Sequence, residues 1–308
     1  MKDAMQSTAR GVAEMTTAML ISGTIGWFVV QSREPALSVV FWRCAFGAAT
    51  LLVICAALGF LRRGVITPRQ LGMAAVGGIA IVVNWLMLFA SYSHASIAIA
   101  TAVYNTQPFM LVALGALFMR ERLTGSKVLW LCLAFVGMLF IVGAKPSAAY
   151  VGANYAAGIA LAVGAAACYA LAAFITKKLT AVPPHLIALI QVSVGVVMLA
   201  PFAANGGLPM GAMSWLMLAT IGAVHTGLMY ILLYGAIQKL PTNLIGALSF
   251  VYPLAAIAVD YVGFGHRLHA TQLLGAAAIL IAAAGMTLGW KLAPASSGKR
   301  TRALAEER

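Results

Sequence analysis

Ten apolar segments, each about as long as a membrane-spanning helix, constrain the fold of this chain more than any other feature. A helix needs about 20 mostly apolar residues to cross the hydrocarbon core of a bilayer. The links between the segments are short, so they leave no room for a separate soluble domain. The sequence therefore predicts an all-α membrane protein with ten spanning helices, near residues 13–31, 37–60, 70–92, 96–119, 126–144, 155–176, 185–203, 212–236, 242–262 and 270–290.

The composition and the placement of charge agree with a membrane protein. Hydrophobic residues make up 62% of the chain and charged residues 9%, whereas soluble domains carry about 25% charge. The net charge of +13 lies in short clusters between the apolar segments, which is typical of cytoplasmic membrane loops rather than of a nucleic-acid-binding face. With the N-terminus inside, the outer links hold only Arg33, Lys145 and Arg267, so both termini are expected in the cytoplasm.

Three smaller features complete this outline. The first apolar segment lacks a convincing small-residue cleavage site, so we expect it to be retained as a helix. Residues 291–308 form a basic, polar stretch that we expect to be a disordered cytoplasmic tail. The four cysteines lie in apolar segments without the spacing of a metal or disulfide framework, and we expect them to be small buried hydrophobes: Cys44, Cys55, Cys132 and Cys168.

Two related stretches, 96–122 and 241–267, indicate an internal repeat. Pro253 follows Pro108 by 145 residues, and Arg267 follows Arg122 by the same 145 residues. Few other residues are identical, so the matching order of spans is the stronger argument. Residues 13–145 and 155–290 then form two units of five helices each. Because five is odd, the second unit enters the membrane from the opposite side, which predicts an inverted repeat around a central cavity.

These features resemble a known family. The five-plus-five spans, the mid-helix prolines and the sequence Arg120-Glu121-Arg122-Leu123 after the fourth helix are similar to the EamA-domain branch of the drug/metabolite transporter superfamily. Within it, the chain looks most like bacterial exporters of aromatic and hydrophobic amino acids of the YddG type. The second unit departs from the pattern, because His266 stands where the family's glutamate would be repeated.

The resemblance implies a cavity lined by helices one, three, four, six, eight and nine, with helices five and ten at the periphery. It also implies a multi-pass protein of the bacterial inner membrane that exports small metabolites by alternating access. We expect a monomer without a cofactor or metal, whose partners are a small-molecule substrate and membrane lipid, and not nucleic acid.

Polar residues at mid-depth are the candidate substrate ligands. Tyr104 and Asn105 share a helix face with Pro108, and Ser249 and Tyr252 lie close to Pro253. The alternative is that the prolines only kink their helices, as structural hinges, and nearby side chains satisfy the freed carbonyls.

Asn84 in the third helix offers a donor and an acceptor, as an amino-acid backbone requires, or it joins two helices. Trp27 and Tyr169 occupy equivalent places in the two units and could stack on an aromatic substrate, although Trp27 also suits an interfacial belt. Trp85 and Tyr230 are further aromatic candidates.

Two ionisable residues lie deep in apolar helices. His225 is either a structural hydrogen-bonding group or a pH-sensitive gate. Arg43 requires a partner, such as a helix-end carbonyl or a carboxylate, and is either a structural charge or a ligand for a substrate carboxylate.

The sequence favours a transporter over two other classes. An intramembrane enzyme would need paired aspartates, an H-E-x-x-H motif or a serine beside a histidine, and the sequence contains no such motif. A channel would need rings of like groups or a charged lining. All seven acidic residues lie in tails, links or helix ends, which argues for facilitated transport or for coupling through His225.

Overall fold

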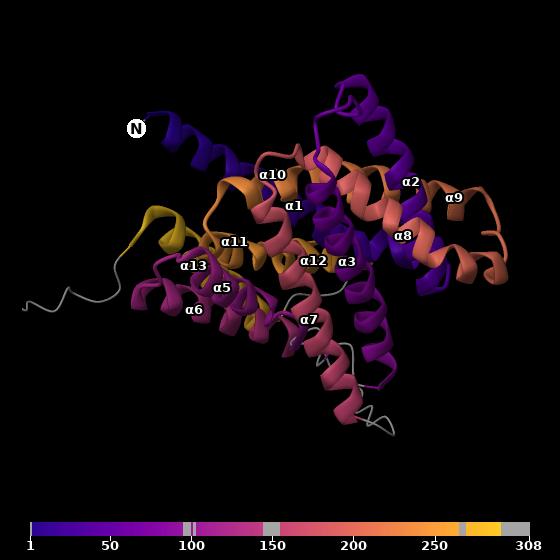
Figure 1. Ribbon diagram of the computed structural model, residues 1–308. Coiled ribbons are helices and arrows are strands. Elements are labelled where there is room, and N and C mark those ends of the chain that lie inside the picture. The colour runs from indigo at the N-terminus through magenta and orange to yellow at the C-terminus, as the bar shows by residue number, and fades with distance from the viewer. Residues whose placement is uncertain (1, 95–99, 101–102, 144–154, 265–268, 291–308) are drawn as a thin grey trace, which may run out of the picture.

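The computed structural model describes residues 2–94, 100, 103–143, 155–264 and 269–290, and within these residues every regular element is helical (Figure 1). The all-α prediction is therefore confirmed for the described residues. Arg267, His266, Lys145 and the tail 291–308 lie outside them. The helices are α1 (Lys2–Ser32), α2 (Ala36–Ala57), α3 (Pro68–His94), α5 (Gln107–Met119), α6 (Gly125–Gly143), α7 (Tyr155–Lys178), α8 (Pro184–Gly206), α9 (Ala212–Thr220), η1 (Ile221–Leu228), α10 (Met229–Lys239), α11 (Thr242–Ser249), α12 (Val251–Phe264) and α13 (Ala270–Leu288).

The helices have the length and surface of membrane spans. Among the described residues, eight helical stretches are long and apolar enough to cross a membrane, and two shorter apolar helices lie at Gln107–Met119 and Gly125–Phe140. Large apolar side chains face outward, as Val262 (82% exposed) and Leu117 (73% exposed) show. Such an apolar surface matches a lipid environment, because contact with lipid tails carries no hydrophobic cost, unlike contact with water.

Helix packing is nearly unchanged when the two halves of the chain are exchanged. The contact of α3 with α7 corresponds to that of α10 with α1, and the contact of α3 with α8 corresponds to that of η1 with α2. Three contacts correspond to themselves: α2 with α8, α5 with α11, and α6 with α13. In Figure 1, α6 and α13 lie at one end of the molecule and α2, α8 and α9 at the other. Most helix contacts therefore cross from one half to the other.

Both halves contain a helix that is interrupted at the same repeat position. The fourth segment breaks at Asn105 and Thr106, before α5, and the ninth breaks at Phe250, between α11 and α12. Phe250 follows Asn105 by 145 residues, the offset that relates the two prolines. Pro108 and Pro253 lie in the first turn of the restarted helices, where the missing N–H loses no intrahelical hydrogen bond. Both proline side chains are buried, so neither faces lipid.

A π-helix, η1, interrupts the eighth apolar segment. Its wide turn lets the Thr226 hydroxyl donate to the Ile221 carbonyl at 3.2 Å. Gly222 in η1 packs directly on α2, where a Cβ on Gly222 would lie 2.3 Å from the Cβ of Phe46. Neither the sequence pattern nor helix propensity predicted this element, because the segment reads as one continuous apolar helix.

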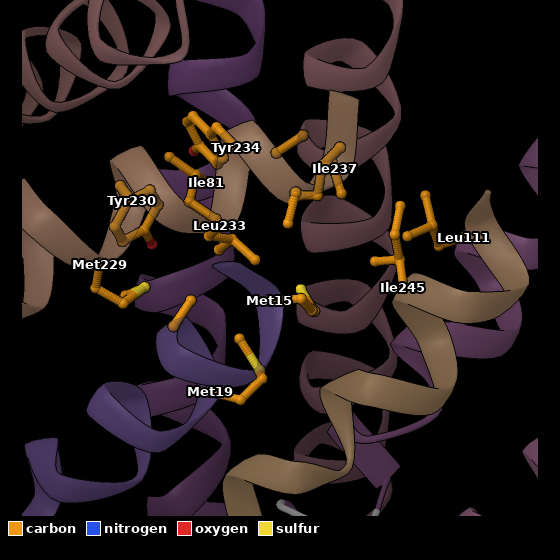
Figure 2. Close-up of a cluster of buried hydrophobic side chains, with 14 of the residues drawn as sticks. Met15, Met19, Ile81, Leu111, Met229, Tyr230, Leu233, Tyr234, Ile237 and Ile245 are labelled. Carbon is orange, nitrogen blue, oxygen red and sulfur yellow. The ribbon is translucent and has the colours of Figure 1, made fainter. Parts of the chain in front are cut away.

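The core lies where the halves interlock. Figure 2 shows Met15 and Met19 of α1 facing side chains of α3, α10 and α11, including Ile81, Leu233 and Ile245. The expectation of four buried cysteines is only partly right. Cys44 and Cys55 are buried, Cys168 is half-buried and Cys132 is exposed on α6, because α6 lies at the periphery of the bundle and turns this side outward.

Candidate functional site

Arg43 lies at the centre of a polar and aromatic cluster between α2, α3 and η1. Its side chain is 6% exposed, and its Nε donates to the Thr226 hydroxyl at 3.2 Å. The guanidinium carbon lies 4.3 Å from the ring centroid of Trp85, in cation–π geometry. Tyr230 packs edge-on against Trp85 with centroids 6.3 Å apart. Trp85 and Tyr230 thus form an aromatic surface beside Arg43, a cation that lies deep in an apolar segment.

Tyr230 extends this cluster along α10. Its ring packs edge-on against Tyr234, with centroids 5.1 Å apart, and the Tyr234 hydroxyl donates to Oε1 of Gln191 on α8. The Nε2 of Gln191 is buried without a hydrogen-bond partner among the described residues. The cluster therefore connects α2, α3, η1, α10 and α8 and crosses from one half to the other.

His225 faces the opposite side of η1, toward α1. Its Nε2 lies 2.8 Å from the Thr24 hydroxyl, and its ring packs on Phe28 with centroids 4.9 Å apart. Its Nδ1 is buried without a hydrogen-bond partner among the described residues. A buried imidazole held by one hydroxyl can exchange a proton only if water or a substrate reaches Nδ1. This geometry fits both the structural and the gating interpretation of His225.

The candidate aromatic residues fall into two places. Tyr104, just before the interruption that precedes α5, packs edge-on against Tyr169 of α7 with centroids 6.4 Å apart. Trp27 packs on Phe28, and a Cβ on Gly263 of α12 would lie 2.9 Å from its ring. Contacts therefore join Tyr169 to Tyr104, whereas Trp27 belongs with α12 and does not share these neighbours.

The candidates near the interruptions are held by backbone contacts or packing. The Ser249 hydroxyl donates to the Ile245 carbonyl at 2.8 Å, which is a bond within its own helix. Tyr252 packs against the main core beside α1, and Asn105 is 4% exposed. Pro108 faces Gly246 of α11, where a Cβ would lie 3.3 Å from the Cβ of Pro108. The interrupted helices of the two halves thus meet at the proline.

Asn84 is fully buried and joins α3 to α7. Its Nδ2 donates to the Ala165 carbonyl at 2.7 Å, while its Oδ1 is buried without a partner among the described residues. The hydrogen bond between α3 and α7 is thus present, and Oδ1 makes no second bond among the described residues. Asn84 therefore joins the two halves of the chain through the Nδ2 end of its amide group.

Replacing Asn84 by leucine is expected to lower the free energy of unfolding by about 1 kcal/mol. The change removes one interhelical hydrogen bond while keeping the number and branching of the side-chain heavy atoms, and such bonds in membrane proteins contribute about 0.6–1.7 kcal/mol. Thermal unfolding in detergent measures the difference. Ser249→Ala is the matched control, because its lost bond lies within one helix and should change stability little. Equal stability of Asn84→Leu and the wild type would refute a packing role for Asn84.

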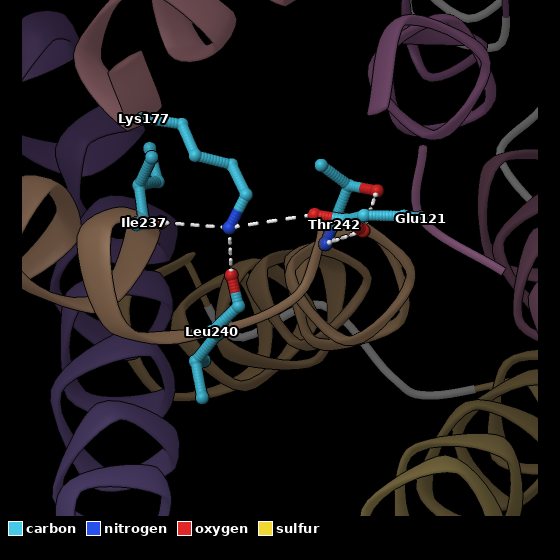
Figure 3. A network of polar contacts seen from close by, with 5 residues as sticks. All are labelled: Glu121, Lys177, Ile237, Leu240 and Thr242. Atoms are coloured by element: carbon cyan, nitrogen blue, oxygen red, sulfur yellow. Dashed lines mark hydrogen bonds and ion pairs between the residues drawn. The ribbon is translucent and has the colours of Figure 1, made fainter. Parts of the chain in front are cut away.

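A second polar network, which the sequence analysis missed, ties the halves together at the ends of α5, α7 and α10 (Figure 3). The Nζ of Lys177 donates to the Leu240 carbonyl, lies 3.5 Å from the Ile237 carbonyl, and forms an ion pair with Glu121 at 3.6 Å. Glu121 accepts hydrogen bonds from the backbone N–H of Thr242 at 2.8 Å and from its hydroxyl at 2.7 Å.

This network matches charges to the two helix ends that it joins. Lys177 neutralises the carbonyl end of α10, and Glu121 caps the amide end of α11, so each charge meets the favourable end of a helix dipole. Arg120 adopts a left-handed conformation (φ 55°) that ends α5 and directs the chain so that Glu121 reaches Thr242. In the sequence, Lys177 counted only as one of many inner cations. Its position directly beside Lys178 gave no sign that it would be buried.

The carboxylates whose side chains are described lie outside the central cluster, although Glu14 lies inside α1 rather than at a helix end, because α1 begins earlier than expected, at Lys2. Glu14 pairs with Lys239 at 2.5 Å and Arg10 at 2.9 Å, Glu34 accepts from Ser38 at 3.2 Å, and Glu121 belongs to the network of Figure 3. The central cluster offers a guanidinium, hydroxyls, amides and aromatic faces. Such groups bind and orient a small molecule. Proton transfer to a carboxylate during transport would require an acidic residue other than Glu14, Glu34 and Glu121.

The fold and this site define a multi-pass membrane protein built from two halves that meet around a buried polar cluster. Comparison with known proteins identifies the family. The model of the EamA-like transporter family matches residues 9–143 and again residues 156–288. The chain therefore belongs to the EamA-like transporter family, whose members are membrane transporters, and it carries the family unit twice.

Individual relatives agree with this assignment. The chain is 31% identical to "Uncharacterized transporter YxxF" of Bacillus subtilis over 92% of its own length and 89% of the relative's. It is 29% identical to the threonine/homoserine exporter RhtA of Escherichia coli K12 over 66% of each chain. A solved chain described as "Crystal structure of protein" superposes with a TM-score of 0.81, covering 93% of this chain and all of the other, at 18% identity. This last similarity concerns the fold alone.

Proposed function

We propose that this protein is a secondary transporter that exports small metabolites, with aromatic and hydrophobic amino acids as its substrates. Packing that is preserved when the halves are exchanged, around a buried polar cluster, supports this proposal most strongly. An inverted pair of five-helix units can expose such a seam alternately to the two sides of a membrane. The proposal places a monomer with ten spans in the bacterial inner membrane, with both termini in the cytoplasm.

The proposed substrate site lies at the seam, near the two helix interruptions. Tyr104 and Tyr169 supply aromatic edges, and Asn84 and His225 each hold one buried polar atom without a partner among the described residues. Irregular backbone at membrane depth is tolerated where it is enclosed by protein or lines a water-filled cavity. The remaining proposed ligands flank these positions: Trp27, Asn105, Ser249 and Tyr252.

Counterflow in proteoliposomes tests the proposal. Vesicles preloaded with unlabelled phenylalanine should accumulate labelled phenylalanine transiently, with saturable dependence on concentration and without an imposed pH gradient. Flux that rises linearly with concentration would indicate a pore, and absence of exchange for every amino acid tested would refute amino-acid transport. A severalfold increase of the exchange rate under a pH gradient would indicate proton coupling rather than facilitated transport.

Small polar amino acids are the second candidate substrates, because the relative RhtA is named a threonine/homoserine exporter. Competition between labelled phenylalanine and unlabelled threonine separates the two possibilities. We expect phenylalanine to exchange and threonine to compete weakly, because aromatic side chains surround the proposed site. Stronger exchange of threonine than of phenylalanine would assign the chain to the second class.

A further inference from the structure

The guanidinium of Arg43 is buried with most of its hydrogen-bonding capacity unused. A guanidinium carries five N–H donors. Among the described residues, one donor bonds the Thr226 hydroxyl, and Trp85 covers a face of the group without accepting a hydrogen bond. Arg43 itself is 6% exposed and its neighbour Thr226 is fully buried, so bulk water reaches little of the charged group. A charge in such a position is costly unless an anion approaches it.

The described carboxylates do not supply that anion. Glu14, Glu34 and Glu121 are each held by other groups. Their partners are cations, hydroxyls and a backbone amide, and moving any of them to Arg43 would break those bonds. The centre of the described structure therefore has an excess positive charge at a place where the proposed transport pathway would run.

The surroundings of Arg43 also indicate the shape of an anion that it could bind. Trp85 and Tyr230 stand at right angles beside the guanidinium and are 7% and 4% exposed. A planar guanidinium binds a carboxylate through two parallel hydrogen bonds, and adjoining aromatic rings favour an apolar or aromatic body. A cationic ligand would meet a fixed like charge in a medium of low dielectric constant, which disfavours binding.

We propose that Arg43 is the anion anchor of the transport site, and that the substrates are small carboxylates with an apolar or aromatic body. This inference rests on the proposed function and narrows it, because it requires the carboxylate and rejects amines and cationic drugs. In this arrangement Thr226 orients the guanidinium through Nε, which leaves the two terminal nitrogens for the substrate.

Competition on the wild-type protein is the first test and involves no variant that could misfold. Unlabelled 3-phenylpropionate and phenethylamine compete against labelled phenylalanine in the counterflow assay, since each lacks one charged group of phenylalanine. We expect 3-phenylpropionate to compete at least about tenfold better, because one charge-assisted hydrogen bond discriminates by about ten- to a hundredfold. Equal competition, or better competition by phenethylamine, would overturn the anchor. Absence of phenylalanine counterflow would instead refute the proposed function.

Variants provide the second test. Arg43→Gln should raise the KM for phenylalanine about ten- to a hundredfold and abolish the preference for 3-phenylpropionate over phenethylamine. Arg43→Lys keeps the charge without the planar fork, so it should retain the preference while raising KM. Arg63→Gln, an exposed arginine in the link after α2, is the matched control and should behave as the wild type.

A purely structural role for Arg43 gives a different pattern. Thr226→Val removes the bond between α2 and η1 but leaves the positive charge. Under the structural role, Arg43→Gln and Thr226→Val should lose thermal stability alike and leave the carboxylate preference intact. That pattern would overturn the anchor, whereas loss of the preference in Arg43→Gln and its retention in Thr226→Val supports the anchor.

Discussion

Replacing Lys177 by methionine is expected to lower the free energy of unfolding by about 3 kcal/mol and to weaken the contacts between α7, α10 and the end of α5. Removing one member of a buried ion pair costs about 3–5 kcal/mol, because the other charge stays behind without compensation. We take the lower end of that range because the Glu121 side chain is 18% exposed and keeps its bonds to Thr242. The carbonyls of Ile237 and Leu240 also lose their donor. Reversible unfolding in detergent measures the loss.

The neighbouring lysine provides the control for this change. Lys178 is exposed on the next position of α7, with its Nζ 5.4 Å from the Phe174 ring. Lys178→Met removes the same charge and should change stability by less than about 0.5 kcal/mol. A second check combines Lys177→Met with Glu121→Gln, whose losses should be strongly non-additive because the residues form one network. Equal effects at the two lysines would contradict a specific role for the network of Figure 3.

Replacing Gly222 by alanine is expected to lower the free energy of unfolding by about 1–3 kcal/mol. An added Cβ would lie 2.3 Å from the Cβ of Phe46 and 2.9 Å from the backbone nitrogen of Gly47. Both neighbours belong to α2 and cannot move aside as flexible side-chain ends can. Overpacking of this kind costs about 1–3 kcal/mol. The shift would also move Thr226 relative to Arg43, so thermal unfolding and the KM for phenylalanine should change together.

Gly26→Ala is the matched control for Gly222→Ala. A Cβ on Gly26 meets nothing within 4 Å, and the position lies inside α1. Alanine there should leave stability unchanged or raise it by up to about 1 kcal/mol, because alanine has the higher helix propensity. Destabilisation by Gly26→Ala equal to that by Gly222→Ala would show that packing against α2 does not decide the result at Gly222.

The sequence predicted the large-scale organisation because that organisation depends on length, periodicity and order. Apolar segments of span length predicted the helices, and the repeat marked Pro108 and Pro253 as equivalent positions, although the interruption just before each proline was not predicted. These features are local or repeat at a fixed interval, so they can be read along the chain. The partner of Arg43 could not be read along the chain in this way, because Thr226 lies 183 residues away. The expected partners were a helix-end carbonyl or a carboxylate, whereas the observed partner is a hydroxyl.

Other features escaped prediction because they depend on tertiary packing. Gly26 and Gly222 look alike in the sequence as small residues in apolar helices, yet one packs against α2 and the other meets open space. Lys177 and Lys178 are adjacent and chemically identical, and only the rotation of α7 decides which is buried. The π-helix η1 likewise has no signal in its composition, although Gly222 within it packs closely on α2.

The interlocking of the halves has a consequence for how the protein is made. Within the described part of the first half, packing between helices is largely limited to α2 against α3. The surfaces of α1, α3 and α6 that become core are covered by α10, α7 and α13, which the ribosome delivers later. The early helices are therefore inserted into the bilayer before their packing partners are synthesised. A chain truncated after the first half would lack most of its contacts between helices.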